Sequence, residues 1–160
     1  MKKKIVLMLT VIMLIGLAGC GKNQINIKET GTSDNNEQMV QNIYENKRTE
    51  VKQKISEIKE RLPETSAEDK GTCGSKAKWY YKDNTLIIYG EGVITEDTWH
   101  KSNIVINTVV IDSGITKLGN NMFSGLGSEV GKNIENFYIA DGLEEIGSST
   151  FVNCDCLSEI

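Results

Sequence analysis

The sequence predicts a mainly β protein. Its expected fold is a short solenoid of repeated coils with an N-terminal β-hairpin cap, preceded by a signal peptide and a helical stalk. Three observations lead to this prediction. The C-terminal third aligns with itself at a shift of 28 residues, which indicates a repeat. Two strand-like segments joined by a turn precede the repeat, and a charged segment of helical character precedes them.

The composition bounds the classes of function. The chain has 160 residues, with 18 Lys and Arg against 22 Asp and Glu and a formal net charge of -4. Neutralising phosphates requires a basic face, so no nucleic-acid partner is expected. His100 is the only histidine and Pro63 the only proline. A histidine-rich metal site and a Ser-His-Asp arrangement therefore have little room, and proline-rich and collagen-like classes are excluded.

Residues 1–19 are expected to be an export signal. Lys2, Lys3 and Lys4 precede an apolar run of fourteen residues, 5–18. A helix of that length spans about 21 Å, less than the roughly 30 Å hydrocarbon core, which favours a signal peptide over a membrane-spanning helix. The run ends in Leu-Ala-Gly-Cys, with Gly19 and Cys20 last.

This ending resembles the bacterial lipobox, in which the cysteine receives a diacylglyceryl group before the chain is cut on its N-terminal side. The resemblance implies lipidation of Cys20 and cleavage between Gly19 and Cys20. The alternative is a plain secretory signal with an incidental cysteine. Two or more acyl chains give stable anchoring, so the protein is expected on the extracytoplasmic face of the bacterial cell membrane, at the cell surface.

A flexible tether is expected over residues 20–36. Only Ile25 and Ile27 are strongly apolar in the stretch after the cysteine. Such a segment cannot bury enough surface to offset the entropy lost on ordering.

Residues 37–62 predict a helical stalk that ends before Pro63, followed by a polar linker over 63–70. A sustained coiled coil needs three or four heptads of apolar residues, and Arg48 interrupts the apolar seam of this segment. A single solvated helix, weakly packed on the rest of the chain, is therefore favoured over a weak coiled coil. The seam consists of apolar residues spaced 4, 3 and 4 apart: Val51, Ile55, Ile58 and Leu62.

Residues 71–103 predict a β segment that caps the repeats. The stretches 77–81 and 85–89 are rich in aromatic and β-branched residues, and the residues between them have turn chemistry. A hairpin laid against the first repeat would cover an open strand edge and an apolar face.

The repeats are expected over residues 104–160. At the shift of 28, five apolar core positions and two turn glycines of the first copy match the second copy in type. The core positions are Val109, Ile111, Ile115, Leu118 and Phe123 in the first copy, and Phe137, Ile139, Leu143, Ile146 and Phe151 in the second, followed by Cys154. The turn glycines are Gly114 and Gly119 in the first copy, and Gly142 and Gly147 in the second.

An insertion of five residues near 127–131 accounts for part of the shift and leaves a basic period of 23 residues, within the leucine-rich range. Each copy has a short strand, a glycine at 114 or 142 that is expected to adopt a positive φ where the chain turns, and a phenylalanine expected to pack between coils. A single copy cannot bury its own apolar face, so the copies are expected to stack. The sequence stops at Ile160, which favours a truncated array over an open end that a partner covers.

The strings Gly114–Phe123 and Gly142–Cys154 resemble the BspA-type leucine-rich repeat of bacterial surface proteins. They depart from it where Met122 and Thr150 occupy the usual alanine position and where Leu126 replaces a cysteine. The resemblance covers about 50 residues. It implies adhesion or interaction at the cell surface, with host proteins or other cells as ligands.

The stretch Gly71–Gly92 resembles the short β segment that often opens such arrays. In that segment a tryptophan-bearing strand precedes a strand that ends in Gly-x-Gly. Here these features are Trp79 and the residues 90–92, and Trp99 fits the second tryptophan that commonly follows.

No catalytic residue, metal site or cofactor is predicted. Cys154 occupies the position of Leu126 in the preceding copy, which is typical of a small buried hydrophobe. A zinc site built from Cys73, Cys154, Cys156 and His100 lacks the usual ligand spacing. One of these three cysteines would stay unpaired, so reduced, packed cysteines are expected, and His100 is expected on the surface.

The expected function is therefore that of a lipid-anchored surface protein whose repeats mediate protein–protein interaction or adhesion. One alternative is a structural envelope scaffold without a specific ligand. Another is the N-terminal part of a larger surface protein with an appended domain. An enzyme would need a catalytic domain beyond Ile160.

Overall fold

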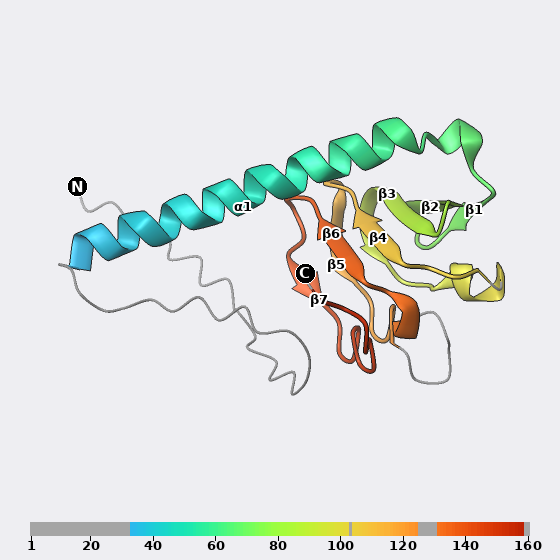
Figure 1. Ribbon diagram of the computed structural model, residues 1–160. Helices are drawn as coiled ribbons and strands as arrows, with labels where there is room; N and C mark the ends of the chain where they lie inside the picture. The colour runs from blue at the N-terminus through green and yellow to red at the C-terminus, as the bar shows by residue number, and fades with distance from the viewer. Residues whose placement is uncertain (1–32, 103, 125–130, 159–160) are drawn as a thin grey trace.

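One long helix leads into a sheet of seven strands in the computed structural model, which describes residues 33–102, 104–124 and 131–158 (Figure 1). Over these residues the protein is mainly strands with one α-helix, as the sequence predicts. The elements are α1 (Ser33–Arg61), β1 (Asp69–Thr72), β2 (Lys76–Lys82), β3 (Thr85–Ile94), β4 (Thr108–Ile111), β5 (Ile115–Leu118), β6 (Asn136–Ile139) and β7 (Glu145–Ile146), with 3-10 helices at Glu64–Ser66, Thr98–Ser102 and Gly131–Asn133.

The expected signal peptide, the expected lipidation site Cys20 and most of the expected tether lie outside the described residues. Among the helices that are described, none is long and apolar enough to cross a membrane.

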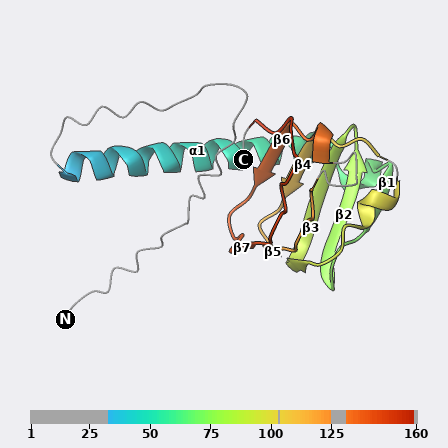
Figure 2. The same cartoon turned by 90° about the horizontal axis from the view of Figure 1, so that it is seen from below.

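The two copies of the repeat lie side by side in two parallel ladders. Strands β3, β4 and β6 form one ladder, and β3, β5 and β7 form the other (Figure 2). Val109 pairs with Phe137 in the first ladder and Leu118 pairs with Ile146 in the second. Both pairs are separated by the 28 residues of the sequence repeat.

The expected hairpin is formed by the antiparallel strands β2 and β3. Asp83 and Asn84 at its turn have φ values of 47° and 56°, in the left-handed region that Asp and Asn tolerate and that tight hairpin turns require. Strand β3 is longer than the sequence predicts, because it continues through Gly90 and Gly92, with φ values of 100° and 86°. It therefore belongs to the hairpin and also begins both parallel ladders.

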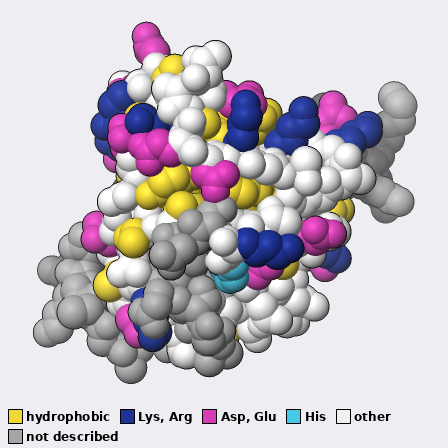
Figure 3. All heavy atoms as spheres, turned by 90° about the vertical axis from the view of Figure 1, so that its right-hand side faces the viewer, with side chains coloured by type: hydrophobic (Ala, Val, Ile, Leu, Met, Phe, Trp, Pro, Cys, Tyr) yellow, Lys and Arg dark blue, Asp and Glu magenta, His cyan; other side chains and the backbone are white. Residues whose placement is uncertain are grey.

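The end of the sheet at the hairpin has a mixed surface, with positive and negative side chains interspersed (Figure 3). The ion pairs of β2 contribute to this mixture. Lys82 Nζ lies 2.8 Å from Glu68 Oε1, and Lys76 Nζ lies 3.2 Å from Glu91 Oε2. The charge on this end is therefore not of a single sign.

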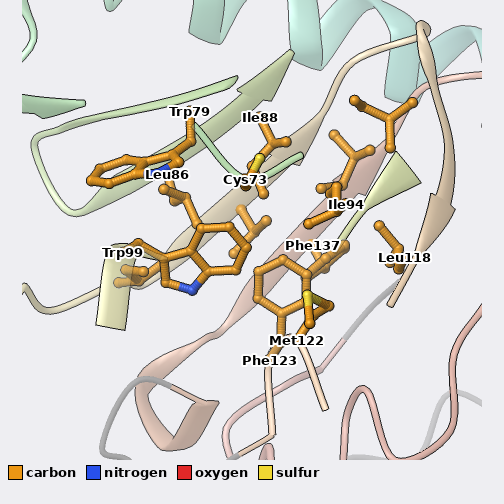
Figure 4. Packing of buried hydrophobic residues seen from close by; sticks show 14 of the residues in the cluster. Cys73, Trp79, Leu86, Ile88, Ile94, Trp99, Leu118, Met122, Phe123 and Phe137 are labelled. Atoms are coloured by element: carbon orange, nitrogen blue, oxygen red, sulfur yellow. The ribbon is translucent and has the colours of Figure 1, made fainter. Parts of the chain in front are cut away.

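The inner face of the sheet is packed with aliphatic side chains and aromatic rings (Figure 4). The rings of Trp99 and Phe123 lie 5.4 Å apart and nearly parallel, and those of Phe123 and Phe151 lie 6.2 Å apart in the same orientation. Phe137 meets Phe123 and Phe151 edge-on at 4.9 and 5.0 Å. Such contacts add stability beyond the burial of apolar area. Trp99 is therefore the first ring of the stack.

The prediction of a solvated helical stalk is wrong for the C-terminal half of α1. Ile55, Ile58 and Leu62 are buried and pack on the outer face of the sheet. The hydroxyl of Tyr80 donates a hydrogen bond of 2.9 Å to the carbonyl oxygen of Leu62. The physical reason is that side chains alternate along a strand, so apolar residues on the outer face of β2, β3 and β4 need a cover that the repeats do not supply.

Two boundaries also differ from the predictions. The helix begins at Ser33, so the last four residues assigned to the tether, 33–36, are helical. The expected linker over 63–70 contains a 3-10 turn and the start of β1, which pairs with β2. A polar sequence concealed this edge strand, because only its pairing with a neighbouring strand defines it.

The turn glycines serve two different physical needs. Gly142 has a φ of 111°, the left-handed conformation expected for a turn. The expectation of such a conformation at Gly114 is wrong. There a Cβ would collide with the carbonyl oxygen of Gly90, so the absent side chain permits close approach of adjacent turns. Gly147 likewise lies against the backbone of Gly119.

Candidate interaction surface

The candidate surface is the outer face of the first ladder together with α1, which lies across it. Tyr80, Ile87, Val110 and Tyr138 occupy the outward position on successive strands, one on each of β2, β3, β4 and β6. Ile87 and Val110 are fully buried beneath the helix, and Tyr138 is partly buried. The surface is therefore an apolar strip across the strands.

Basic residues of α1 clamp the helix to the turns that follow β4 and β6. Arg48 Nε and Lys52 Nζ each lie 2.6 Å from a carboxylate oxygen of Asp141. Lys59 pairs in the same way with Asp112. Each of the two stacked turns thus supplies one acid to the helix.

These ion pairs lower the pKa of both acids. Hydrogen bonds from Arg48 and Lys52 hold the pKa of Asp141 below its usual range. Burial by itself would raise the pKa of Asp112, but hydrogen bonds from Lys59 and Ser113 outweigh it and lower the pKa. Both carboxylates are therefore ionised at neutral pH, and the clamp is charged.

Two grooves run beside the helix. The larger has a volume of about 670 Å³, and its walls include Lys52, Lys59 and the two clamped aspartates. The smaller, of about 440 Å³, lies on the side of Arg61 and Tyr138. A single helix therefore does not fill the whole width of the strip.

The repeat core residues are largely buried as expected. Phe137 is 3% exposed and Cys154 is 8% exposed, whereas Ile139, Leu143 and Phe151 are partly buried against the core. Ile146 contradicts its assignment to the core, since it is 48% exposed. The reason is its position on β7, whose only partner among the described strands is β5. The fully buried members of the set are Val109, Ile111, Ile115, Leu118 and Phe123.

The cysteines of the described residues are all free. Burial raises the pKa of Cys73 to about 12 and that of Cys154 to about 11. The Cys154 thiol donates a hydrogen bond of 3.1 Å to the carbonyl oxygen of Phe123. Thiols with such pKa values stay protonated at neutral pH and are poor nucleophiles. Cys156 is exposed.

His100 is less exposed than the sequence suggests. It lies in a 3-10 helix with 23% of its side chain exposed, and its Nδ1 lies 3.1 Å from Asp97 Oδ2. Its neighbour Trp99 is fully buried because it belongs to the aromatic stack. Within the described residues, no group of three or more His, Cys, Asp or Glu side chains could hold a metal ion.

Sequence reasoning missed the clamp of α1. Arg48, Lys52 and Lys59 are spaced 4 and 7 residues apart, which places them on one side of a helix. That spacing can be read from the sequence. The acidic partners cannot, because Asp112 lies 53 residues from Lys59 and Asp141 lies 93 residues from Arg48. Nothing in the local sequence links them.

The comparisons with known proteins are sparse. No family model matches the chain, and no curated protein matches it. Among solved structures, it is similar to a leucine-rich repeat protein from Eubacterium ventriosum, with 25% identity and a TM-score of 0.45 over 53% of this chain. The chain spans 23% of the length of that protein. A superposition this partial assigns neither a fold nor a function.

Proposed function

We propose that this protein is held by a lipid on Cys20 at the extracytoplasmic face of the bacterial cell membrane, and that its repeats bind another protein or a cell surface. The repeats would form a short leucine-rich solenoid of the BspA type. The lipobox-like sequence supports the anchor, and the motif resemblance supports the repeat type.

The observation that carries the proposal is the pairing of the two copies at the repeat distance of 28 residues in both ladders. Stacked repeats form an extended surface rather than an enclosed pocket. An extended surface suits recognition of a macromolecule, whereas small-molecule ligands are usually bound in enclosed cavities. The grooves beside α1 are bordered by ion pairs of the fold itself.

Metabolic labelling with a fatty-acid analogue tests the anchor. Cys20→Ala should abolish labelling and leave the chain uncleaved or released. Cys156→Ala is the matched control, because Cys156 is an exposed cysteine outside the lipobox, and it should label as the wild type does. Equal labelling of Cys20→Ala and wild type would refute lipidation at this position.

Binding of the full-length protein to immobilised host matrix proteins and to intact cells tests the interaction role. Saturable binding to one of these is expected. Absence of saturable binding to any of them would contradict the interaction role and favour the envelope scaffold.

A further inference from the structure

We propose that α1 orients the protein on the membrane. The hairpin end of the sheet, formed by β1 and β2, would point away from the bilayer, and the second repeat copy, with β6 and β7, would lie nearer to it. A partner in the medium or on another cell would then meet the hairpin end and the sides of the coils first. This orientation rests on the proposed lipid anchor at Cys20 and deepens it by naming which end of the sheet is presented outward.

The first observation is the order in which α1 crosses the strands. Arg48 pairs with Asp141, in the turn after β6. Eleven residues later, Lys59 pairs with the acid in the turn after β4. Just beyond the helix, the carbonyl oxygen of Leu62 accepts the hydrogen bond from Tyr80 of β2. The helix therefore runs from the second copy toward the hairpin, and its N-terminal end lies on the side of β6 (Figures 1 and 2).

The second observation is that α1 extends past β6. Fifteen residues of helix, 33–47, precede Arg48, and such a length spans about 22 Å. The whole helix, Ser33–Arg61, has 29 residues and spans about 43 Å. The start of the helix is therefore about twice as far from the hairpin end as from the second copy, measured along the helix.

The helix is attached to the sheet at both ends of this crossing. At the β6 end, Arg48 and Lys52 both pair with Asp141. At the β2 end, Ile58 and Leu62 are buried in the outer apolar cluster. Two separate attachments prevent the helix from pivoting about a single contact. The direction of α1 therefore sets the direction of the sheet.

The proposed lipid would act at the N-terminal end of this helix. Ser33 is thirteen residues after Cys20, and thirteen residues of chain span at most about 45 Å. A lipid on Cys20 would therefore hold the start of α1 within that distance of the bilayer surface. Because the second copy lies closer to the start of α1 than the hairpin does, its mean distance from the bilayer should be smaller.

The charge of the protein does not oppose this orientation. Cleavage before Cys20 would remove three of the 18 basic residues and no acidic one, which leaves 22 acidic residues against 15 basic ones. A bilayer with anionic lipids has a negative surface and attracts basic segments. An acidic body is not drawn flat onto such a surface, so the place of the anchor decides the orientation.

Energy transfer from a donor dye on the protein to acceptor lipids in a vesicle surface tests the orientation. The full-length lipidated protein is reconstituted into phosphatidylcholine vesicles, with acceptor-free vesicles as the baseline. Cys156 carries the donor for the second copy, since it is exposed whereas Cys73 and Cys154 are buried. It lies near the start of β6, because the amide of Ser158 donates a hydrogen bond of 3.4 Å to the carbonyl oxygen of Glu135.

Two variants place the donor at the hairpin end, each combined with Cys156→Ser. Lys70→Cys labels β1, and Lys101→Cys labels the 3-10 helix in which Thr98 donates a hydrogen bond of 2.7 Å to the carbonyl oxygen of Thr72 on β1. Both lysines are exposed, and circular dichroism would verify that the variants stay folded. Four strand spacings separate β1 from β6, or up to about 19 Å. Transfer should therefore be stronger at Cys156 than at either hairpin label.

Met39→Cys, also combined with Cys156→Ser, calibrates the experiment. Met39 is 50% exposed and lies six residues after the start of α1. It should show the strongest transfer of the four labels, because it is nearest to the proposed anchor.

The outcomes separate the orientation from the anchor. Absence of transfer from Met39→Cys would mean that the protein is not held at Cys20, which refutes the proposed anchor and the orientation with it. Strong transfer from Met39→Cys, together with transfer at Lys70→Cys or Lys101→Cys that equals or exceeds that at Cys156, would overturn the orientation and leave the anchor standing.

Discussion

The two faces of the sheet are covered in different ways. The inner face is covered by the repeats together with the segment that precedes them, through a stack of rings from Trp99, Phe123 and Phe151. The outer face is covered by α1, a segment from outside the repeats, through Ile55, Ile58 and Leu62 with charged clamps beside them. The inner packing therefore holds the repeats together, whereas the outer packing attaches α1 to the sheet.

The largest effect is expected at the centre of the inner face. Phe123 is fully buried between two rings, and truncating such a residue costs about 3–5 kcal/mol. Because domains of this size have only about 5–15 kcal/mol of stability, Phe123→Ala should unfold much of the repeat region. Denaturant melts measure this. A loss below about 1 kcal/mol, as at surface sites, would contradict the stacked core.

A smaller effect of a different kind is expected on the outer face. Ile58→Ala should cost about 2 kcal/mol, near the low end for buried isoleucine, because the helix can detach while the inner core persists. Limited proteolysis should then cut within α1 and leave the strands protected.

Ile43→Ala is the control for this experiment, since Ile43 is 38% exposed on the same helix, and it should change neither stability nor cleavage. If Ile58→Ala instead exposed the helix and the strands to protease together, the two faces would not be separable.

Phe151 lies at the end of the ring stack on the inner face, so it can be compared with Phe123 at the centre. It stacks on Phe123 but is only partly buried at the end of the ring stack. Phe151→Ala should therefore cost about 1–2 kcal/mol, less than full burial implies. The same denaturant melts apply, and a loss equal to that of Phe123→Ala would show that the end of the stack is covered in solution.

The smallest effect is expected at the clamp. Asp141 is 38% exposed, so its ion pairs are screened by solvent and Asp141→Asn should cost less than about 1 kcal/mol at neutral pH. The pKa of Asp141 is lowered in the folded protein. Its contribution is therefore present above the unfolded value of about 3.9 and is lost as the pH falls through the folded pKa.

Stability of Asp141→Asn and wild type should consequently converge in acid, as measured by urea melts at pH 7 and at about pH 2–3. Asp155→Asn, at another exposed aspartate, is the control and should track wild type throughout. A deficit of Asp141→Asn that persisted in acid would mean that the clamp is not electrostatic.

The prediction of strands and repeats succeeded where the signal is local. The hairpin of β2 and β3 was readable from two segments rich in aromatic and β-branched residues on either side of Asp83 and Asn84. The role of Trp99 was missed, because it precedes Phe123 by 24 residues rather than 28 and so falls outside the repeat alignment. The strand β1 was missed because its polar sequence has no strand pattern.

The sequence by itself determined the register of the repeats, because matching apolar residues and glycines at a constant distance can all be buried together only in one alignment. The paired strands β4 and β6 keep that distance. Only the tertiary structure decided what covers the outer face. The apolar seam of α1 is compatible with three arrangements. These are a solvated stalk, a coiled coil, and a helix packed on a sheet. The choice depends on which apolar surfaces meet in space, here Ile58 with Ile87 and Val110, and no local pattern encodes that meeting.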